Sequence, residues 1–270
     1  MTSQKLTVAR RTVLRAGIVI GALAAARVLT SSDGGPTAPA PARPGTASGA
    51  PETYRLRPLA GETSRSGPGA SPPRPDVAFT LPGRGREFAL TFDDGPDPRY
   101  TPEILEVLRR HRARATFFVV GECALAFPDL LHYIAEEGHT VGNHTWTHPQ
   151  LTALPLGAVR SELGRTSALI EEVLGTAPTL ARAPYGDWDQ ESLDICNDLG
   201  MSPVGWSVDS QDWTCPGPER IADTVLDGVG SGAIVLSHDG GGDRIQTVQA
   251  LEWYLPELLD DGWSPVLVPR

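Results

Sequence analysis

The sequence predicts an α/β domain whose parallel strands curl into a barrel. Three observations favour this fold class. From about residue 76 to residue 270, short apolar runs alternate with helical patterns, glycines follow several of the helical patterns, and polar residues gather after the apolar runs. Alternating strands and helices are typical of parallel βαβ units. Polar residues at the carboxyl ends of the strands are typical of a barrel with its site on that face. A doubly wound open sheet is the alternative.

The predicted strands are short apolar runs bounded by turn residues. The run at 87–92 lacks a regular polar alternation, which favours a strand buried on both faces. Seven such runs are enough for a barrel-like sheet. In chain order they are 87–92, 115–121, 139–144, 179–184, 203–209, 233–238 and 264–268.

Helices are predicted between these strands because apolar residues recur there at helical spacing. Val159, Leu163 and Ile170 show this spacing clearly. Glycines 138, 175 and 200 stand just beyond three of the segments, where helices commonly end. The predicted helices are 102–112, 128–137, 156–174, 189–199, 217–229 and 245–261.

Two segments precede the predicted domain. In residues 1–31, Arg10 and Arg11 stand ahead of an apolar run that is too short for a comfortable membrane span. This pattern resembles a twin-arginine (Tat) export signal, and a short anchor or a generic Sec signal is the alternative. Residues 32–75 hold ten Pro and seven Gly, a composition typical of a disordered linker. We therefore expect a secreted or cell-wall-associated protein that meets a membrane only during export.

Charge is distributed unevenly along the chain. Residues 1–75 carry a net charge of +7, whereas residues 76–270 carry −17. A domain this acidic is a poor match for nucleic acid, which needs clustered basic residues. It favours a neutral substrate over a polyanion. Lys5 is the only lysine, so the domain has no catalytic lysine.

The three cysteines form no CxxC pair, and their spacing does not match a structural zinc site. In an exported protein, one disulfide and one leftover thiol are compatible with this count. The pairing stays open among Cys123, Cys196 and Cys215.

The first predicted strand ends in two neighbouring acids, Asp93 and Asp94, before Gly95 and Pro96 break it. Where a strand gives way to a turn, both carboxylates can reach the same site. Two acids that close repel each other unless a metal ion, an arginine or a shared proton lies between them. For an isolated DDG segment, a polar turn that caps the strand is the alternative.

A pair of histidines, His144 and His148, follows the third predicted strand. Their spacing predicts that both imidazoles lie on one side of a helical turn and share one metal ion. Glu is absent from the second position, so the segment is not the HExxH motif. With a carboxylate from the first strand end, the pair completes an Asp/His/His set with open positions, which is typical of catalytic zinc. The remaining histidines, His111, His132 and His139, are expected to face solvent.

Three further strand ends carry reactive side chains. Arg182 ends the fourth predicted strand, and an arginine inside a barrel mouth needs an anionic partner. Asp209 and Asp212 follow the fifth strand, and His238 ends the sixth. A salt bridge, a surface loop or a satisfied core histidine would explain each one alone. Their succession after strand ends favours a single site.

These five segments read TFDDG, HTWTH, RAPYG, DSQDW and LSH. They resemble, in order, the five motifs of the NodB-homology polysaccharide deacetylases, carbohydrate esterase family 4, over roughly residues 86–270. The resemblance implies a distorted (β/α)7 barrel of the TIM-like kind that binds one divalent metal, usually zinc and sometimes cobalt or another ion. It implies that Asp94, His144 and His148 are the metal ligands.

The resemblance also implies catalytic roles. Asp93 would be the catalytic base, and Arg182 would orient it. The backbone N–H of Tyr185 would donate to the oxyanion. His238 would be the general acid, and Asp212 would support it. Trp213 and Leu236 would line the acetyl pocket, and Pro184 would lie beside the substrate.

The resulting prediction is a secreted, metal-dependent hydrolase of linear amides other than peptides. It would remove N-acetyl groups from GlcNAc-containing glycans, such as peptidoglycan, chitin or chitooligosaccharides, and release acetate. An O-deacetylase of acetylated xylan with the same motifs is one alternative. A non-catalytic glycan-binding barrel is another. We expect a monomer without a nucleic-acid partner.

Overall fold

The computed structural model describes residues 77–83 and 85–269. The export signal predicted at 1–31 and the linker predicted at 32–75 lie outside these residues. Within the described ranges, no helix combines the length and the apolar character needed to cross a membrane.

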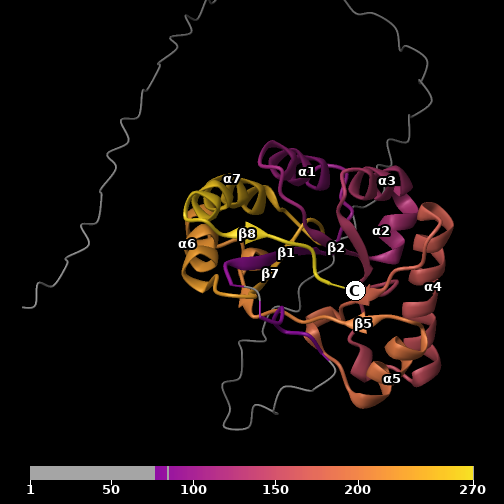
Figure 1. Ribbon diagram of the computed structural model, residues 1–270. Coiled ribbons are helices and arrows are strands. Elements are labelled where there is room, and N and C mark those ends of the chain that lie inside the picture. The colour runs from indigo at the N-terminus through magenta and orange to yellow at the C-terminus, as the bar shows by residue number, and fades with distance from the viewer. Residues whose placement is uncertain (1–76, 84, 270) are drawn as a thin grey trace, which may run out of the picture. The chain divides into compact units, whose positions relative to one another are not determined.

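A parallel sheet forms the centre of the described region, and helices surround it (Figure 1). The strands follow the order β5-β4-β3-β2-β1-β7-β6, and β8 pairs with the beginning of β1. This order agrees with the predicted barrel. The strands are β1 Glu87–Asp93, β2 Thr116–Val119, β3 Thr140–Asn143, β4 Leu180–Ala181, β5 Ser202–Pro203, β6 Val208–Asp209, β7 Ile234–His238 and β8 Ser264–Pro265.

The helices predicted from apolar spacing are present close to their expected bounds. Gly175 ends α4 in the left-handed conformation, with φ 73°, as its position predicted. The short helix α2 was not predicted, because a segment this short shows too little periodicity. The α-helices are α1 Thr101–Arg110, α2 Gly121–Ala126, α3 Pro128–Glu136, α4 Leu156–Leu174, α5 Gln190–Asp198, α6 Pro218–Gly228 and α7 Ile245–Asp260, and the 3₁₀ turns are η1 Leu151–Ala153, η2 Pro184–Gly186 and η3 Asp212–Thr214.

The strand predicted at 203–209 is wrong in one respect. It is two short strands, β5 and β6, which lie at opposite edges of the sheet. The chain changes edges between them, since the N–H of Val204 still donates to β4 whereas that of Ser207 donates to Ile234 of β7. The barrel therefore has a seam, which the segment before β1 bridges: Ala78 pairs with Val204, and Thr80 pairs with Ala233.

Strand β1 is buried on both faces, as predicted. Phe88, Leu90 and Phe92 belong to the apolar cluster that includes residues of helices α1 and α7. Ala89, on the opposite face, packs inside the barrel with residues such as Ile234. Alternation along the strand thus separates an outer, helix-covered face from an inner one.

Candidate active site

Strand alternation directs the predicted catalytic residues into the barrel. Asp93 follows Ala89 by an even number of residues, and His238 follows Ile234 in the same way. Because side chains alternate between faces, both point to the interior that Ala89 and Ile234 line. Both lie at the carboxyl ends of their strands, β1 and β7. This is the face on which a parallel barrel carries its site.

The backbone at Asp94 explains how two consecutive acids share one space. Asp94 has a left-handed backbone, with φ 72°, which an aspartate tolerates better than most residues. The turn brings its carboxylate beside that of Asp93, and both residues are buried. Gly95 follows because a Cβ there would collide with the carboxyl group of Asp239.

One carboxylate oxygen and two imidazole nitrogens converge at this turn. Asp94 Oδ1 lies 3.3 Å from Nε2 of His144 and 3.1 Å from Nε2 of His148. The other ring nitrogen of His144, Nδ1, lies 2.8 Å from the carbonyl oxygen of Arg182. Because a carbonyl oxygen can only accept a hydrogen bond, Nδ1 carries the proton of the neutral ring. The Nε2 atom then keeps a free lone pair, which can bind a cation.

The same three atoms fit a divalent cation. All of them lie within 4.8 Å of one another. Within the described chain, Asp94 Oδ1 is buried without a hydrogen bond of acceptable geometry. A buried acceptor that faces two imidazole nitrogens is stabilised when a cation lies between them, and one oxygen with two nitrogens is a ligand set typical of catalytic zinc.

Electrostatics at these residues favours positive charge between them. Burial opposes ionisation of Asp94, but the imidazoles of His148 and His144 outweigh it and hold its pKa well below the ordinary range. Burial also opposes the charged form of His144, yet the carboxylates of Asp93 and Asp94 raise its pKa.

The local structure predicted for the two histidines is wrong. The HTWTH segment is a loop and not a helical turn, with left-handed backbones at Thr145, φ 69°, and His148, φ 59°. The imidazoles still converge, and their ring centroids are 5.0 Å apart. The histidine spacing is compatible with either conformation, so it predicted the pair but not its backbone.

Asp93 is paired with a buried arginine. Arg182 Nη1 donates to Asp93 Oδ1 over 2.8 Å and to the hydroxyl of Thr91 over 2.8 Å. Its Nη2 donates to the carbonyl oxygen of Gly205 over 2.8 Å. Arg182 is fully buried, so the pair satisfies the expectation that an arginine in the barrel mouth needs an anion. The second oxygen of Asp93, Oδ2, lies 3.7 Å from His144 Nε2.

His238 is paired with a buried acid. Its Nδ1 lies 2.7 Å from Asp212 Oδ1, and its backbone N–H donates to Asp212 Oδ2 over 2.8 Å. Thr247 of α7 donates to the same Oδ2 over 2.8 Å. Burial lowers the pKa of His238, but the charge and hydrogen bond of Asp212 outweigh it and raise the pKa to about 9. His238 is thus an imidazolium at neutral pH.

The remaining predicted residues lie around this centre. Tyr185 has a left-handed backbone, φ 61°, and its ring meets that of His148 edge-on, with centroids 5.0 Å apart. Leu236 is buried on β7, on the same face as His238. Pro184 is buried in turn η2, and Trp213 is half-buried in η3.

Sequence reasoning did not find two buried charged residues beside the site. Asp239 accepts a hydrogen bond from Thr101 over 2.5 Å, while burial and the neighbouring acids raise its pKa to about 7. Arg244 donates through Nε to the carbonyl oxygen of Gly240 over 2.7 Å. That loop lies directly on Asp94, since a Cβ on Gly241 would collide with the Asp94 carboxylate. The sequence signal that could have found them is their position in the segment that follows LSH, with Asp239 directly after it and Arg244 a few residues later.

The expectation that His139 faces solvent is also wrong. His139 is buried, and its Nδ1 accepts from the backbone N–H of Ala115 over 3.1 Å. Burial, with the charge of Arg114, lowers its pKa to about 4. It is a neutral core histidine. In the described part of the chain, all three cysteines are free thiols.

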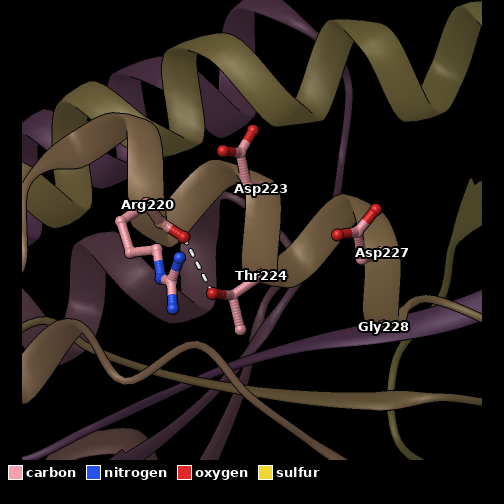
Figure 2. A pocket seen from close by; sticks show the side chains of 5 residues that line it. All are labelled: Arg220, Asp223, Thr224, Asp227 and Gly228. Carbon is pink, nitrogen blue, oxygen red and sulfur yellow. Dashed lines mark hydrogen bonds between the residues drawn. The ribbon is translucent and has the colours of Figure 1, made fainter.

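A hollow of about 400 Å³ lies along helix α6 (Figure 2). The hydroxyl of Thr224 donates to the carbonyl oxygen of Arg220 over 2.8 Å, so its hydrogen is used in a bond within helix α6. Two acids and one arginine on one helix are typical of a solvated face. None of the predicted site residues is among its lining residues, which are Arg220, Asp223, Thr224, Asp227 and Gly228.

Comparison with known proteins identifies relatives that match about 70% of this chain. The family model "Polysaccharide deacetylase" matches residues 81–204. A chitooligosaccharide deacetylase of Bradyrhizobium is 42% identical over 68% of this chain and 90% of its own length. A peptidoglycan-N-acetylglucosamine deacetylase of Bacillus cereus is 38% identical over 71% of this chain and 70% of its own length. Among solved structures, that of the Bc1960 peptidoglycan N-acetylglucosamine deacetylase matches with a TM-score of 0.70 and 37% identity, over 72% of this chain and 91% of that one.

Proposed function

The chain belongs to the polysaccharide deacetylase family, and from that premise we propose that it hydrolyses N-acetyl groups of GlcNAc-containing glycans and releases acetate. Chitooligosaccharides and peptidoglycan are the proposed substrates, because relatives that match 68% and 71% of this chain are named for them. The observation that carries the proposal is the convergence of Asp94, His144 and His148 beside the Asp93–Arg182 pair.

In the proposed metal site, Asp94 Oδ1, His144 Nε2 and His148 Nε2 would be the ligand atoms. A divalent cation bound there, zinc in our proposal, would polarise the acetyl carbonyl and acidify a water molecule. Arg182 occupies Asp93 Oδ1, so Oδ2 is the atom of Asp93 that would accept the proton of the attacking water. The water oxygen becomes part of acetate as the C–N bond breaks.

The leaving amine needs a proton, and His238 is the residue that would supply it. Asp212 holds Nδ1, which leaves Nε2 to donate. Its raised pKa keeps that proton available at neutral pH. We assign the backbone N–H of Tyr185 to the oxyanion, where one such donor is worth about 2.7–4 kcal/mol. Pro184, Trp213 and Leu236 would line the pocket around the acetyl group.

The decisive test is acetate release across a panel of glycans after reconstitution with Zn²⁺ or Co²⁺. We expect release from chitooligosaccharides or peptidoglycan, and none from the metal-free protein. Release from acetylated xylan alone would make the chain an O-deacetylase. A metal-loaded protein that binds these glycans and releases nothing would be a non-catalytic binding barrel.

We also propose that the protein is exported through the Tat pathway, with residues 1–31 as the signal and 32–75 as a spacer. The paired Arg10 and Arg11 ahead of an apolar run support this proposal. Replacing both with lysine should retain the protein inside the cell, whereas unchanged secretion would contradict Tat export. We propose that the exported protein is a monomer, which its mass in solution would show.

A further inference from the structure

The loop that carries both histidine ligands is held in an unfavourable conformation. Thr145 and His148 are non-glycine residues with left-handed backbones, φ 69° and 59°. Such conformations cost energy and persist only where surrounding contacts hold them. Since His148 itself is one of the two, the position of its imidazole depends on those contacts.

The backbone groups of this loop have partners that lie elsewhere in the chain. The carbonyl oxygens of Thr145 and Trp146 accept from the N–H groups of Gly121 and Glu122, over 2.9 and 3.1 Å. These bonds attach one side of the loop to the beginning of α2. Two of the three N–H groups between the histidines, those of Trp146 and Thr147, are directed to another neighbour, helix α4.

One carboxylate of α4 receives both of these N–H groups. Glu162 Oε2 accepts from the N–H of Trp146 over 2.8 Å and from that of Thr147 over 2.7 Å. Glu162 Oε1 accepts from the hydroxyl of Thr147 over 3.1 Å. Hydrogen bonds to an ionised acceptor are the stronger kind. A single side chain thus satisfies the polar backbone midway between His144 and His148.

Other contacts fix α4 against the same loop. The Trp146 ring is buried and lies 4.0 Å from the guanidinium of Arg165, one turn after Glu162. Asn143 donates to the carbonyl oxygen of Leu163 over 2.7 Å and accepts from the N–H of Thr145 over 2.8 Å. These contacts of Leu163 and Arg165 hold this part of α4, and with it the Glu162 carboxylate, at the loop.

We propose that Glu162 is a positioning residue of the metal site, which holds His144 and His148 at the spacing that one cation requires. The inference rests on the proposed function in one respect, namely that these histidines bind a metal ion. Partners that orient ligands in this way typically change metal affinity about 10–100-fold when they are lost. Glu162 acts through the loop, because its carboxylate is hydrogen-bonded to Trp146 and Thr147, which lie between the two histidines in the chain.

The test compares Zn²⁺ affinity among variants of the full chain, by competition with a chromophoric chelator. Glu162→Met keeps the side-chain length but removes the acceptor, so we expect about 10–100-fold weaker binding. Glu162→Gln keeps one acceptor oxygen for the two N–H groups and should restore most of the affinity. Glu172→Met is the matched control, because Glu172 is exposed on the same helix, and it should bind as the unsubstituted protein does.

Thermal unfolding of the metal-free variants shows whether they fold. If Glu162→Met does not fold, Glu162→Asp replaces it, because the shorter side chain withdraws the carboxylate and should also weaken binding. A folded Glu162→Met or Glu162→Asp with unchanged Zn²⁺ affinity would overturn the inference and leave the proposed function intact. Failure of the unsubstituted protein to bind Zn²⁺ would instead overturn the proposed metal site, and the inference with it.

Discussion

Asp93 and His238 are register partners across the parallel strands β1 and β7. Neighbouring strands lie about 4.7–4.9 Å apart, so the proposed base and the proposed acid stand side by side at one rim of the barrel. Each has a buried partner of opposite charge, Arg182 for Asp93 and Asp212 for His238. The carboxylate of Asp93 and the imidazolium of His238 thus lie next to each other, while each forms its ion pair with another residue.

Replacing Asp93 with asparagine should abolish turnover and leave the metal bound. The amide cannot accept the proton of the attacking water, and general-base catalysis is typically worth about 10²–10⁴-fold in rate. Acetate release and metal content, measured on the same preparation, check this prediction. Asp94→Asn is the matched control and should lose the metal. If Asp93→Asn loses the metal while Asp94→Asn retains it, the two roles are exchanged.

Replacing Arg182 with methionine should destabilise the fold strongly. The substitution leaves the buried Asp93 carboxylate without its cation, and breaking a buried pair in this way costs about 3–5 kcal/mol. Urea unfolding of the metal-free protein measures the loss. Arg160→Met, in the exposed pair with Asp198, should cost no more than about 1 kcal/mol. Equal losses for both variants would show that burial of the Arg182 pair is unimportant for stability.

Replacing His238 with alanine should impair amide hydrolysis more than hydrolysis of an activated aryl ester. An amine must be protonated to leave, whereas a phenolate leaves without a proton. Rates on an N-acetyl glycan and on an aryl acetate test the difference. A general-acid role predicts a larger loss on the amide, and the same factor lost on both substrates would argue against it.

The pH profile of amide turnover should depend on Asp212. With a His238 pKa of about 9, turnover should fall as pH rises through that value, because the acid loses its proton. In Asp212→Asn the alkaline limb should move to lower pH, since burial then acts without the compensating carboxylate. A limb at the same pH in both proteins would show that another group controls it.

The same pKa shift makes stability depend on pH. The pKa of His238 is raised above its unfolded value of about 6.5, so its contribution to the free energy of unfolding is fully present below about pH 6.5. It is lost as pH rises through about 9. Urea unfolding at several pH values should show this decline, and Asp212→Asn should show a smaller one.

Much of the fold was predictable because its signals are local. Helices such as α4 show apolar residues at helical spacing together with a terminal glycine, Gly175. Strand β1 is an apolar run with buried residues on both faces. The strand predicted at 203–209 failed because the chain changes sheet edges between Val204 and Ser207. The spacing of apolar residues within the segment does not indicate such a change, because pairing with β4 or with β7 depends on strands that are distant in the sequence.

Residue chemistry in order along the chain was enough to predict the barrel and the side chains gathered at its rim, because motif spacing and strand alternation are properties of short segments. The tertiary structure decided how those side chains are held. The left-handed turn at Asp94, the burial of His139 and the attachment of the histidine loop to Glu162 all depend on partners remote in sequence. A backbone N–H must find an acceptor once it is buried, and only packing determines which residue provides it.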